Sequence, residues 1–418
     1  MKTVNILGLS LILSTSAIAN SVNDTDIQAG KRKAGLCAGC HGLDGISLSD
    51  EYPNLAGQKK RYLITQLNQF KSQYRKSPTM NIIALDLTDD SIELLATYYS
   101  NIQPNPISTV NVAAVAKTDN TQPTKQAFPT PVYISLKKQG AITQLPSLKT
   151  KAGAENMLYN AITADGKTLL ATSPSTNTVL VFKTGRIEQP KHISVGQQPK
   201  GVKISPDGQY AYVSNQGSNN ISVIHLKTLT VTNTIKTDTE PHNVRFTKDG
   251  KTAYVTLQGG AGIGVIDTTK QRQTKVIPVP GITGPHNLDL SQDEKIAFVR
   301  DFIHHVAVVD LQSGETLKVI KVGNGHGGID VAPNGKYVST AAIGDDHITV
   351  IDTQTLDATP VKVGNGPHGI RYSSDSQWIY VTVTKDNRVV VINAKTLKVE
   401  NTLKTGAFPF WISVPNNP

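Results

Sequence analysis

Short stretches that alternate between apolar and polar residues recur along the C-terminal two thirds of the chain. In TEPHNVRFTKDGKTAYVTL and NGPHGIRYSSDSQWIYVTV, for example, a glycine or proline precedes one alternating strand, and a polar turn leads to a second. Third and fourth strands follow before the pattern starts again. The equivalent positions of the first strands are Leu158, Lys200, His242, His286, Gly327, His368 and Phe410. They lie 41 to 44 residues apart, a period typical of four-stranded propeller blades.

The repeat predicts seven blades. Six complete repeats run from about 152 to 406. FPFWISV at 408–414 is one further first strand, and residues 131–145 offer strands that lack a first strand of their own. Pairing these two ends closes a seventh blade and leaves no open sheet edge. The repeats resemble YVTN-repeat propellers, a family that defines architecture rather than activity. Residues 129–418 are therefore expected to form an all-β seven-bladed propeller.

Two segments outside the propeller are expected to have no packed fold. Residues 1–19 carry Lys2, a short apolar run and a small-residue cleavage site, which is the plan of a signal peptide, so we expect export to the periplasm. Residues 103–128 are rich in Pro, Thr, Asn and Ala without periodicity, which predicts an extended linker.

Residues 20–102 are expected to form a helical domain. In LTDDSIELLATYYSNI, Thr88 is an N-cap and acidic residues occupy the first turn, while one face carries apolar residues at Ile92, Leu95, Ala96 and Tyr99. Gly30, in an earlier helical segment, would allow this last helix to cross closely.

The same domain holds both cysteines of the chain. Cys37 and Cys40 are followed directly by His41 in LCAGCHG, and C-x-x-C-H is the attachment signature of c-type haem. A redox dithiol or half a zinc site is the alternative, which His41 and the export signal disfavour. No other histidine precedes His192, so Met80, in a proline-marked loop, is the expected sixth ligand. Ligation by His and Met suits electron transfer.

Residues 26–102 resemble a bacterial class I cytochrome c. The segments CAGCHG, YPNLAGQ, YLITQLNQF, the Met80 loop and LATYY occur in the family's order. The resemblance implies that the carbonyl of Pro53 accepts the proton of the axial His41. The fold class is thus multidomain, an all-α class I cytochrome c followed by the propeller, with one covalent haem c.

Composition excludes several other functions. Two cysteines in 418 residues rule out a disulfide scaffold. The net charge of +10 would help to steer an acidic redox partner protein. The lysines are spread along the chain and no aromatic-basic surface is evident, so we expect no nucleic-acid partner. No later apolar run reaches membrane-spanning length, so we do not expect an integral membrane protein.

Seven of the nine propeller histidines map to one face. His242, His286 and His368 begin first strands, and His326 is displaced by one position. The other three lie in loops between second and third strands: His304, His305 and His347. His192 and His225 fall elsewhere and are expected to be structural.

A bound copper, zinc or iron ion, or a haem-like group, is one interpretation of this face. Duplicated Pro-His turns whose imidazoles serve as hydrogen-bond donors are the other. Arg300, at the end of a second strand, could attract an anionic substrate, or could be an ordinary solvated arginine.

The layout resembles nitrite reductases that join cytochrome c to a haem d1 propeller, although those propellers have eight blades. Exported reductases with histidine-bound copper in seven-bladed propellers are a second comparison. Three hypotheses follow. The chain is a periplasmic oxidoreductase acting on a small anion such as nitrite, a non-catalytic electron carrier whose propeller docks a redox partner, or a carrier of a haem-type cofactor for another enzyme.

Overall fold

The computed structural model describes residues 24–34, 37, 41–42, 45–47, 52–85, 87–103, 128, 130–185, 189–260 and 262–417. Three expectations fall outside these residues. They are the signal peptide at 1–19, the haem-attachment residue Cys40, and nearly all of the linker at 103–128.

The N-terminal domain is helical. Its helices are α1 (Asp24–Lys33), α3 (Lys60–Lys71), α4 (Pro78–Leu85) and α5 (Asp89–Asn101). Thr88 caps α5 as predicted, since its hydroxyl accepts a hydrogen bond from the Ser91 backbone N–H. The predicted apolar face of α5 is buried. A Cβ on Gly30 would lie 2.2 Å from the Leu94 carbonyl oxygen, so only glycine permits this crossing of α1 and α5.

The segment that carries Met80 differs from the expected loop. It forms α4, an eight-residue helix that begins at Pro78. Proline is favoured in the first turn of a helix because its missing N–H has no intrahelical partner there. Pro78 therefore starts the helix, where the sequence analysis took it as the sign of a loop.

The propeller consists of seven four-stranded sheets. The innermost strands are β4 (Asn160–Ile162), β8 (Pro199–Ile204), β12 (Pro241–Phe246), β16 (Pro285–Leu290), β20 (Ile329–Val331), β24 (Pro367–Tyr372) and β28 (Pro409–Ser413). The second strands are β5 (Thr168–Ser173), β9 (Tyr210–Asn215), β13 (Thr252–Leu257), β17 (Ile296–Asp301), β21 (Tyr337–Thr340), β25 (Trp378–Val383) and β1 (Val132–Leu136).

The remaining strands complete each blade outward. The third strands are β6 (Thr178–Lys183), β10 (Asn220–His225), β14 (Gly262–Asp267), β18 (His305–Asp310), β22 (His347–Asp352), β26 (Arg388–Asn393) and β2 (Ala141–Leu145). The outer strands are β7 (Lys191–Ser194), β11 (Thr230–Lys236), β15 (Arg272–Pro278), β19 (Thr316–Lys321), β23 (Ala358–Lys362), β27 (Val399–Lys404) and β3 (Lys149–Ala152).

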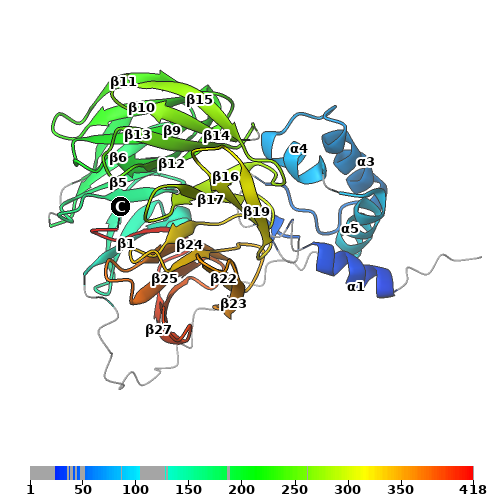
Figure 1. Cartoon of the computed structure of the whole chain (residues 1–418). Coiled ribbons are helices and arrows are strands. Elements are labelled where there is room, and N and C mark those ends of the chain that lie inside the picture. Colours follow the sequence, from blue (N-terminus) through cyan, green and yellow to red (C-terminus); the bar gives the residue numbers. More distant parts are fainter. Residues whose placement is uncertain are drawn as a thin grey trace, which may run out of the picture.

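The two ends of the propeller sequence close the ring, as the repeat count predicted. β28 pairs antiparallel with β1, so that Tyr133 lies opposite Ser413 and Ile134 opposite Ile412. Apolar side chains of neighbouring blades form shared clusters, for example Val181 with Val202. Figure 1 shows the helical domain at one side of this ring. No helix among the described residues is long and apolar enough to cross a membrane.

Candidate functional site

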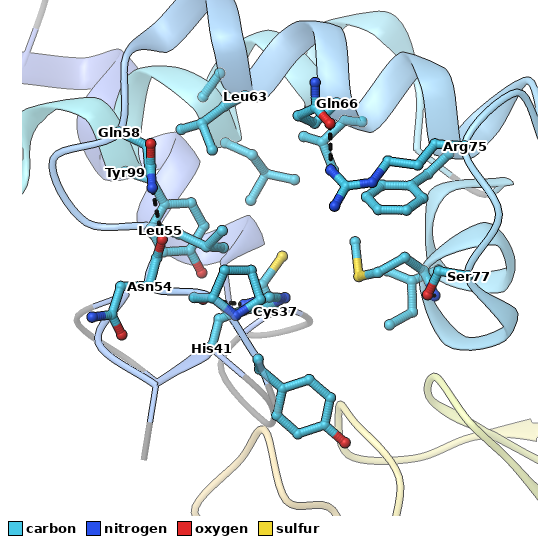
Figure 2. Close-up of a pocket in the computed structure, with 18 of the residues that line it drawn as sticks. Cys37, His41, Asn54, Leu55, Gln58, Leu63, Gln66, Arg75, Ser77 and Tyr99 are labelled. Carbon is cyan, nitrogen blue, oxygen red and sulfur yellow. Dashed lines mark hydrogen bonds between the residues drawn. The ribbon is translucent and has the colours of Figure 1, made fainter. Parts of the chain in front are cut away.

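A cavity of about 340 Å³ opens in the helical domain beside the C-x-x-C-H segment. Cys37, His41 and Met80 all line it. Figure 2 shows Cys37 and His41 on one side, and Ser77, just before the helix that carries Met80, on the other. Most of the remaining wall is apolar: Leu55, Leu63, Leu67, Phe70, Ile83, Leu95, Ala96 and Tyr99. An apolar cleft with a few convergent polar groups suits a porphyrin.

The axial histidine is oriented as the resemblance implied. The Nδ1–H of His41 donates to the Pro53 carbonyl oxygen at 2.8 Å. This bond leaves Nε2 as the nitrogen with a free lone pair, which is the atom that a haem iron requires. Burial lowers the pKa of His41, although the bond to Pro53 opposes that shift. The described residues therefore fit a haem c held by Cys37 and His41.

The propeller contributes to the same cavity. Phe302, Gly325 and His326 line it together with the helical residues. The His326 ring stacks on Phe302, with centroids 4.5 Å apart and an interplanar angle of 14°. One face of the haem pocket is thus built by loops of the blades formed by β16–β19 and β20–β23.

His326 also belongs to a second group, the central histidines, defined as His242, His286, His326 and His368. Their rings form a chain, with centroids 4.0 Å apart for His242 and His286, 4.9 Å for His286 and His326, and 5.2 Å for His326 and His368. One ring nitrogen from each of His286, His326 and His368 lies within 4.8 Å of the others. This spacing would allow one metal ion to bind all three.

Three inner strands, β12, β16 and β24, begin with the dipeptide Pro-His, and each has a β-bulge at that point. The register of β12 against β13 shifts between Pro241 and Val244, and the corresponding shifts in β16 and β24 also include the histidine. A bulge interrupts the strict alternation of a strand and redirects a side chain. The hydroxyl of Thr256 then accepts a hydrogen bond from the bulged Asn243 N–H at 2.9 Å, and Thr382 does the same for Gly369 at 2.7 Å.

Hydrogen bonds to carbonyls assign the tautomers of two central histidines, His242 and His368. The Nδ1–H of His242 donates to the His286 carbonyl, and that of His368 to the Phe410 carbonyl, each at 2.9 Å. The Tyr159 hydroxyl lies between Nε2 of His242 and Nε2 of His286, at 3.5 and 3.4 Å. Nδ1 of His286 and Nε2 of His368 are buried and have no hydrogen-bond partner among the described residues. Buried nitrogens of this kind need an explanation, and a metal ion would supply one.

All four central histidines favour the neutral form. Burial lowers the pKa of His242 and of His368 to about 3. Burial also holds the pKa of His286 and of His326 well below the usual value, and neighbouring imidazoles add to the shift. Neutral imidazole is the form that binds metals.

The three loop histidines, His304, His305 and His347, form separate contacts. The rings of His304 and His305 lie 4.1 Å apart, and Nδ1 of His305 lies 3.0 Å from an Asp301 carboxylate oxygen. Nδ1 of His347 lies 3.0 Å from Asp345. All three side chains are partly exposed. No described contact brings a loop histidine against the ring of a central histidine.

Arg300 is fully buried, so the expectation of a solvated arginine is wrong. One terminal nitrogen pairs with Asp301 at 2.8 Å and also donates to the His305 carbonyl. The other donates to the carbonyls of Gly323, at 2.8 Å, and of Gly325. With these nitrogens engaged, Arg300 ties the loop that leads to His326 to the loop that carries His305.

Comparison with curated proteins decides the N-terminal domain. Cytochrome c-554(548) of Halomonas halodenitrificans is 39% identical over 79 residues, which are 18% of this chain and 95% of that protein. The chain belongs to the cytochrome c family. Cytochrome c4 of Pseudomonas aeruginosa is 33% identical over 96 residues, or 23% of this chain. The match spans about half the length of that relative.

The propeller of this cytochrome matches family models only in part. Residues 131–237 match the model described as "Lactonase, 7-bladed beta-propeller", and residues 218–337 match a choice-of-anchor I domain. Among solved structures, the dihydro-heme d1 dehydrogenase NirN in complex with DHE aligns over 94% of this chain and 99% of its own, with a TM-score of 0.54 and 16% identity. At that identity, the likeness concerns the fold alone.

Two residues of this cytochrome that sequence reasoning missed are Tyr159 and Phe302. Tyr159 directly follows Leu158, the position equivalent to His242 in the first complete repeat. An aromatic residue beside a histidine-bearing repeat position was the available signal. Phe302 lies between Arg300 and His304, and nothing in the sequence indicated that it would stack on a histidine 24 positions later.

Proposed function

We propose that this cytochrome is a periplasmic oxidoreductase. In it, haem c exchanges electrons with a second transition-metal centre held by His286, His326 and His368. The observation that carries the proposal is the position of His326, whose side chain belongs to both the haem cavity and the central histidines. A residue shared by two adjacent sites gives the short contiguous route that electron exchange needs.

The first centre is a covalent haem c, which supplies reversible one-electron transfer. Cys37 and Cys40 would attach it, and His41 and Met80 would be its axial ligands. The chain itself orients the axial histidine and keeps water from the haem: Pro53 fixes the His41 ring, and the apolar wall excludes water. Both features set the potential of a haem site.

The second centre needs a redox-active metal that binds imidazole, which is either a bare copper or iron ion or the iron of a tetrapyrrole. Zinc would fit the ligands but cannot exchange electrons. The tetrapyrrole is supported by the fold shared with a protein described as a dihydro-heme d1 dehydrogenase. A small anion such as nitrite is the proposed substrate. Export by residues 1–19 and an acidic redox partner complete the proposal, supported by the leader-like sequence and by the net charge of +10.

The test is the metal content and visible spectrum of the full chain, exported in cells that attach haem c. We expect one haem c and a second metal, or an additional absorption band if the second group is a tetrapyrrole. His368→Gln should remove the second centre and leave the haem c spectrum intact. His192→Gln is the matched control, because His192 is exposed on β7 and distant in sequence from the central histidines.

A second centre that persists in His368→Gln would overturn the assignment to the central histidines. A parent protein that contains haem c and no second metal, even after incubation with copper, zinc and iron, would instead favour an electron carrier whose propeller docks a partner. A band that transfers to an apo-enzyme on mixing would favour a cofactor carrier.

A further inference from the structure

A ring of charged residues lies in the central channel of the propeller. Three positions after the equivalent repeat positions given in the sequence analysis, the chain places Lys203 on β8, Arg245 on β12, Asp289 on β16, Asp330 on β20 and Arg371 on β24. Four of these residues are less than one tenth exposed, and the side chain of Arg245 is 19% exposed. Charges this deep in a protein require partners, because water no longer solvates them.

Both carboxylates of the ring have their partners. Nε of Arg245 pairs with Asp289 at 2.6 Å, and Arg371 pairs with Asp330. The other oxygen of Asp289 accepts the Val331 N–H at 2.8 Å. The other oxygen of Asp330 accepts the Tyr372 N–H at 2.7 Å and the Asn417 amide at 3.1 Å. The two aspartates are thus engaged by two arginines and by neutral N–H donors.

Lys203 is the one charged residue of the ring for which the described residues provide no ion-pair partner. Its side chain is 7% exposed, and it makes no hydrogen bond and no ion pair with the described residues. When Lys203 is protonated, the ring has three cations and two anions and so carries one uncompensated positive charge. Burial and the guanidinium groups of Arg245 and Arg371 lower the pKa of Lys203 well below its usual value, although Asp289 and Asp330 oppose that shift. An anion beside Lys203 would favour its ammonium form.

A small cavity of about 20 Å³ with both polar and apolar walls adjoins this lysine. Its polar lining residues are Lys203, Arg371, Ser413, Asn417 and Asn160. The hydroxyl of Ser413 is buried and has no hydrogen-bond partner among the described residues. The side-chain oxygen Oδ1 of Asn160 likewise has no hydrogen-bond partner among the described residues. Because an ammonium group has three protons, Lys203 could donate both to that oxygen and to an anion. The volume holds one particle about the size of a water molecule.

We propose that this cavity binds a small monovalent anion of halide size, with chloride as the biological ligand, between Lys203 and the Ser413 hydroxyl. A monatomic anion matches the volume, supplies the missing negative charge and accepts from the unpartnered hydroxyl. A water molecule would satisfy the hydroxyl but leave the charge of Lys203 uncompensated. The site lies deeper in the channel than the central histidines and is independent of the second redox centre.

The test uses crystals of the full chain soaked in bromide, whose anomalous signal identifies the ion. We expect one peak in the cavity, within hydrogen-bond distance of Lys203 and Ser413. In solution, replacing gluconate by chloride at constant ionic strength should raise the Tm by about 3 °C for each tenfold increase above the dissociation constant.

Lys203→Met should abolish the chloride response, whereas Lys251→Met, at an exposed turn, should keep it. The bromide experiment needs only the parent protein, so it decides the matter even if Lys203→Met fails to fold. An ordered water without anomalous signal, together with a chloride-independent Tm, would overturn the proposal. Neither measurement involves the central histidines, so the anion site and the second redox centre stand or fall separately.

Discussion

The central histidines belong to four consecutive blades and the loop histidines to two of these, yet their surroundings are opposite. The central histidines begin or directly precede inner strands, three of the four are almost fully buried, and their hydrogen-bond partners are carbonyls and Tyr159. The loop histidines are partly exposed, and His305 and His347 contact aspartates. Position within the blade therefore decides whether an imidazole here is buried in the channel or lies beside a carboxylate.

Protonation follows the same division. Burial lowers the pKa of each central histidine and also that of the loop histidine His304, so the division holds for His347 alone among the shifted loop histidines. The Asp345 hydrogen bond raises the pKa of His347. One group stays neutral at physiological pH, and at least one member of the other is drawn toward the charged form. Four variants test this comparison.

Arg300→Met should have the largest effect, because it removes the link between the two groups. It leaves Asp301 buried without its arginine, and breaking a buried pair costs about 3–5 kcal/mol of unfolding free energy. Denaturant unfolding of the propeller would measure the loss. Arg388→Met, at a partly exposed pair with Asp386, should cost about 1 kcal/mol or less. Equal losses in both variants would refute the linking role.

Tyr159→Phe should have an intermediate effect. It removes the hydroxyl between His242 and His286 at a cost of about 1 kcal/mol in stability. Because outer partners orient metal ligands, affinity for the second metal should fall roughly 10–100-fold. Competition with a chelator would measure that affinity. Unchanged affinity would mean that the tyrosine does not orient the site.

The double variant His304→Gln, His305→Gln should change little. Both residues are partly exposed, so stability should shift by less than about 1 kcal/mol, and the second centre should remain. Metal analysis and the visible spectrum check this outcome. Loss of the centre would place it at the loop histidines and remove the distinction drawn between the two groups.

The smallest effect should be the pH dependence of His347→Gln. The folded pKa of His347 is raised above 6.5 by Asp345, so its contribution to stability is complete below about pH 6.5 and is lost as pH rises through the folded value. Parent and variant should therefore differ in Tm at pH 5.5 and converge at pH 8.5. A difference that grows with pH would contradict the assigned ion pair.

The sequence was sufficient for features that depend on regular repetition. Seven blades, ring closure by the two ends, and the Thr88 cap all follow from local pattern. The direction of the His41 ring came from family resemblance and is confirmed by the bond to Pro53. These features need only spacing, or contacts between near neighbours in the sequence.

The candidate site was harder to predict because irregular backbone builds it. The bulges that begin β12, β16 and β24 leave no mark in the hydrophobic alternation. His326, which matched the repeat imperfectly, lies before the short strand β20. The next residue is Gly327, where an added Cβ would lie only 2.3 Å from the Ala341 carbonyl oxygen. Arg300 could not be recognised as buried, because two of the carbonyls it binds lie 23 and 25 residues later, in the loop that leads to the next blade.

The closing blade also determines how the haem domain is tethered. The chain enters the propeller through β1, which is hydrogen-bonded to β28 on one side and to β2 on the other. A force that reaches the propeller through its N-terminal end therefore acts on two rows of inter-strand hydrogen bonds at once. It does not pull an edge strand away from its blade. The helical domain can therefore pull on its anchor without opening the propeller ring.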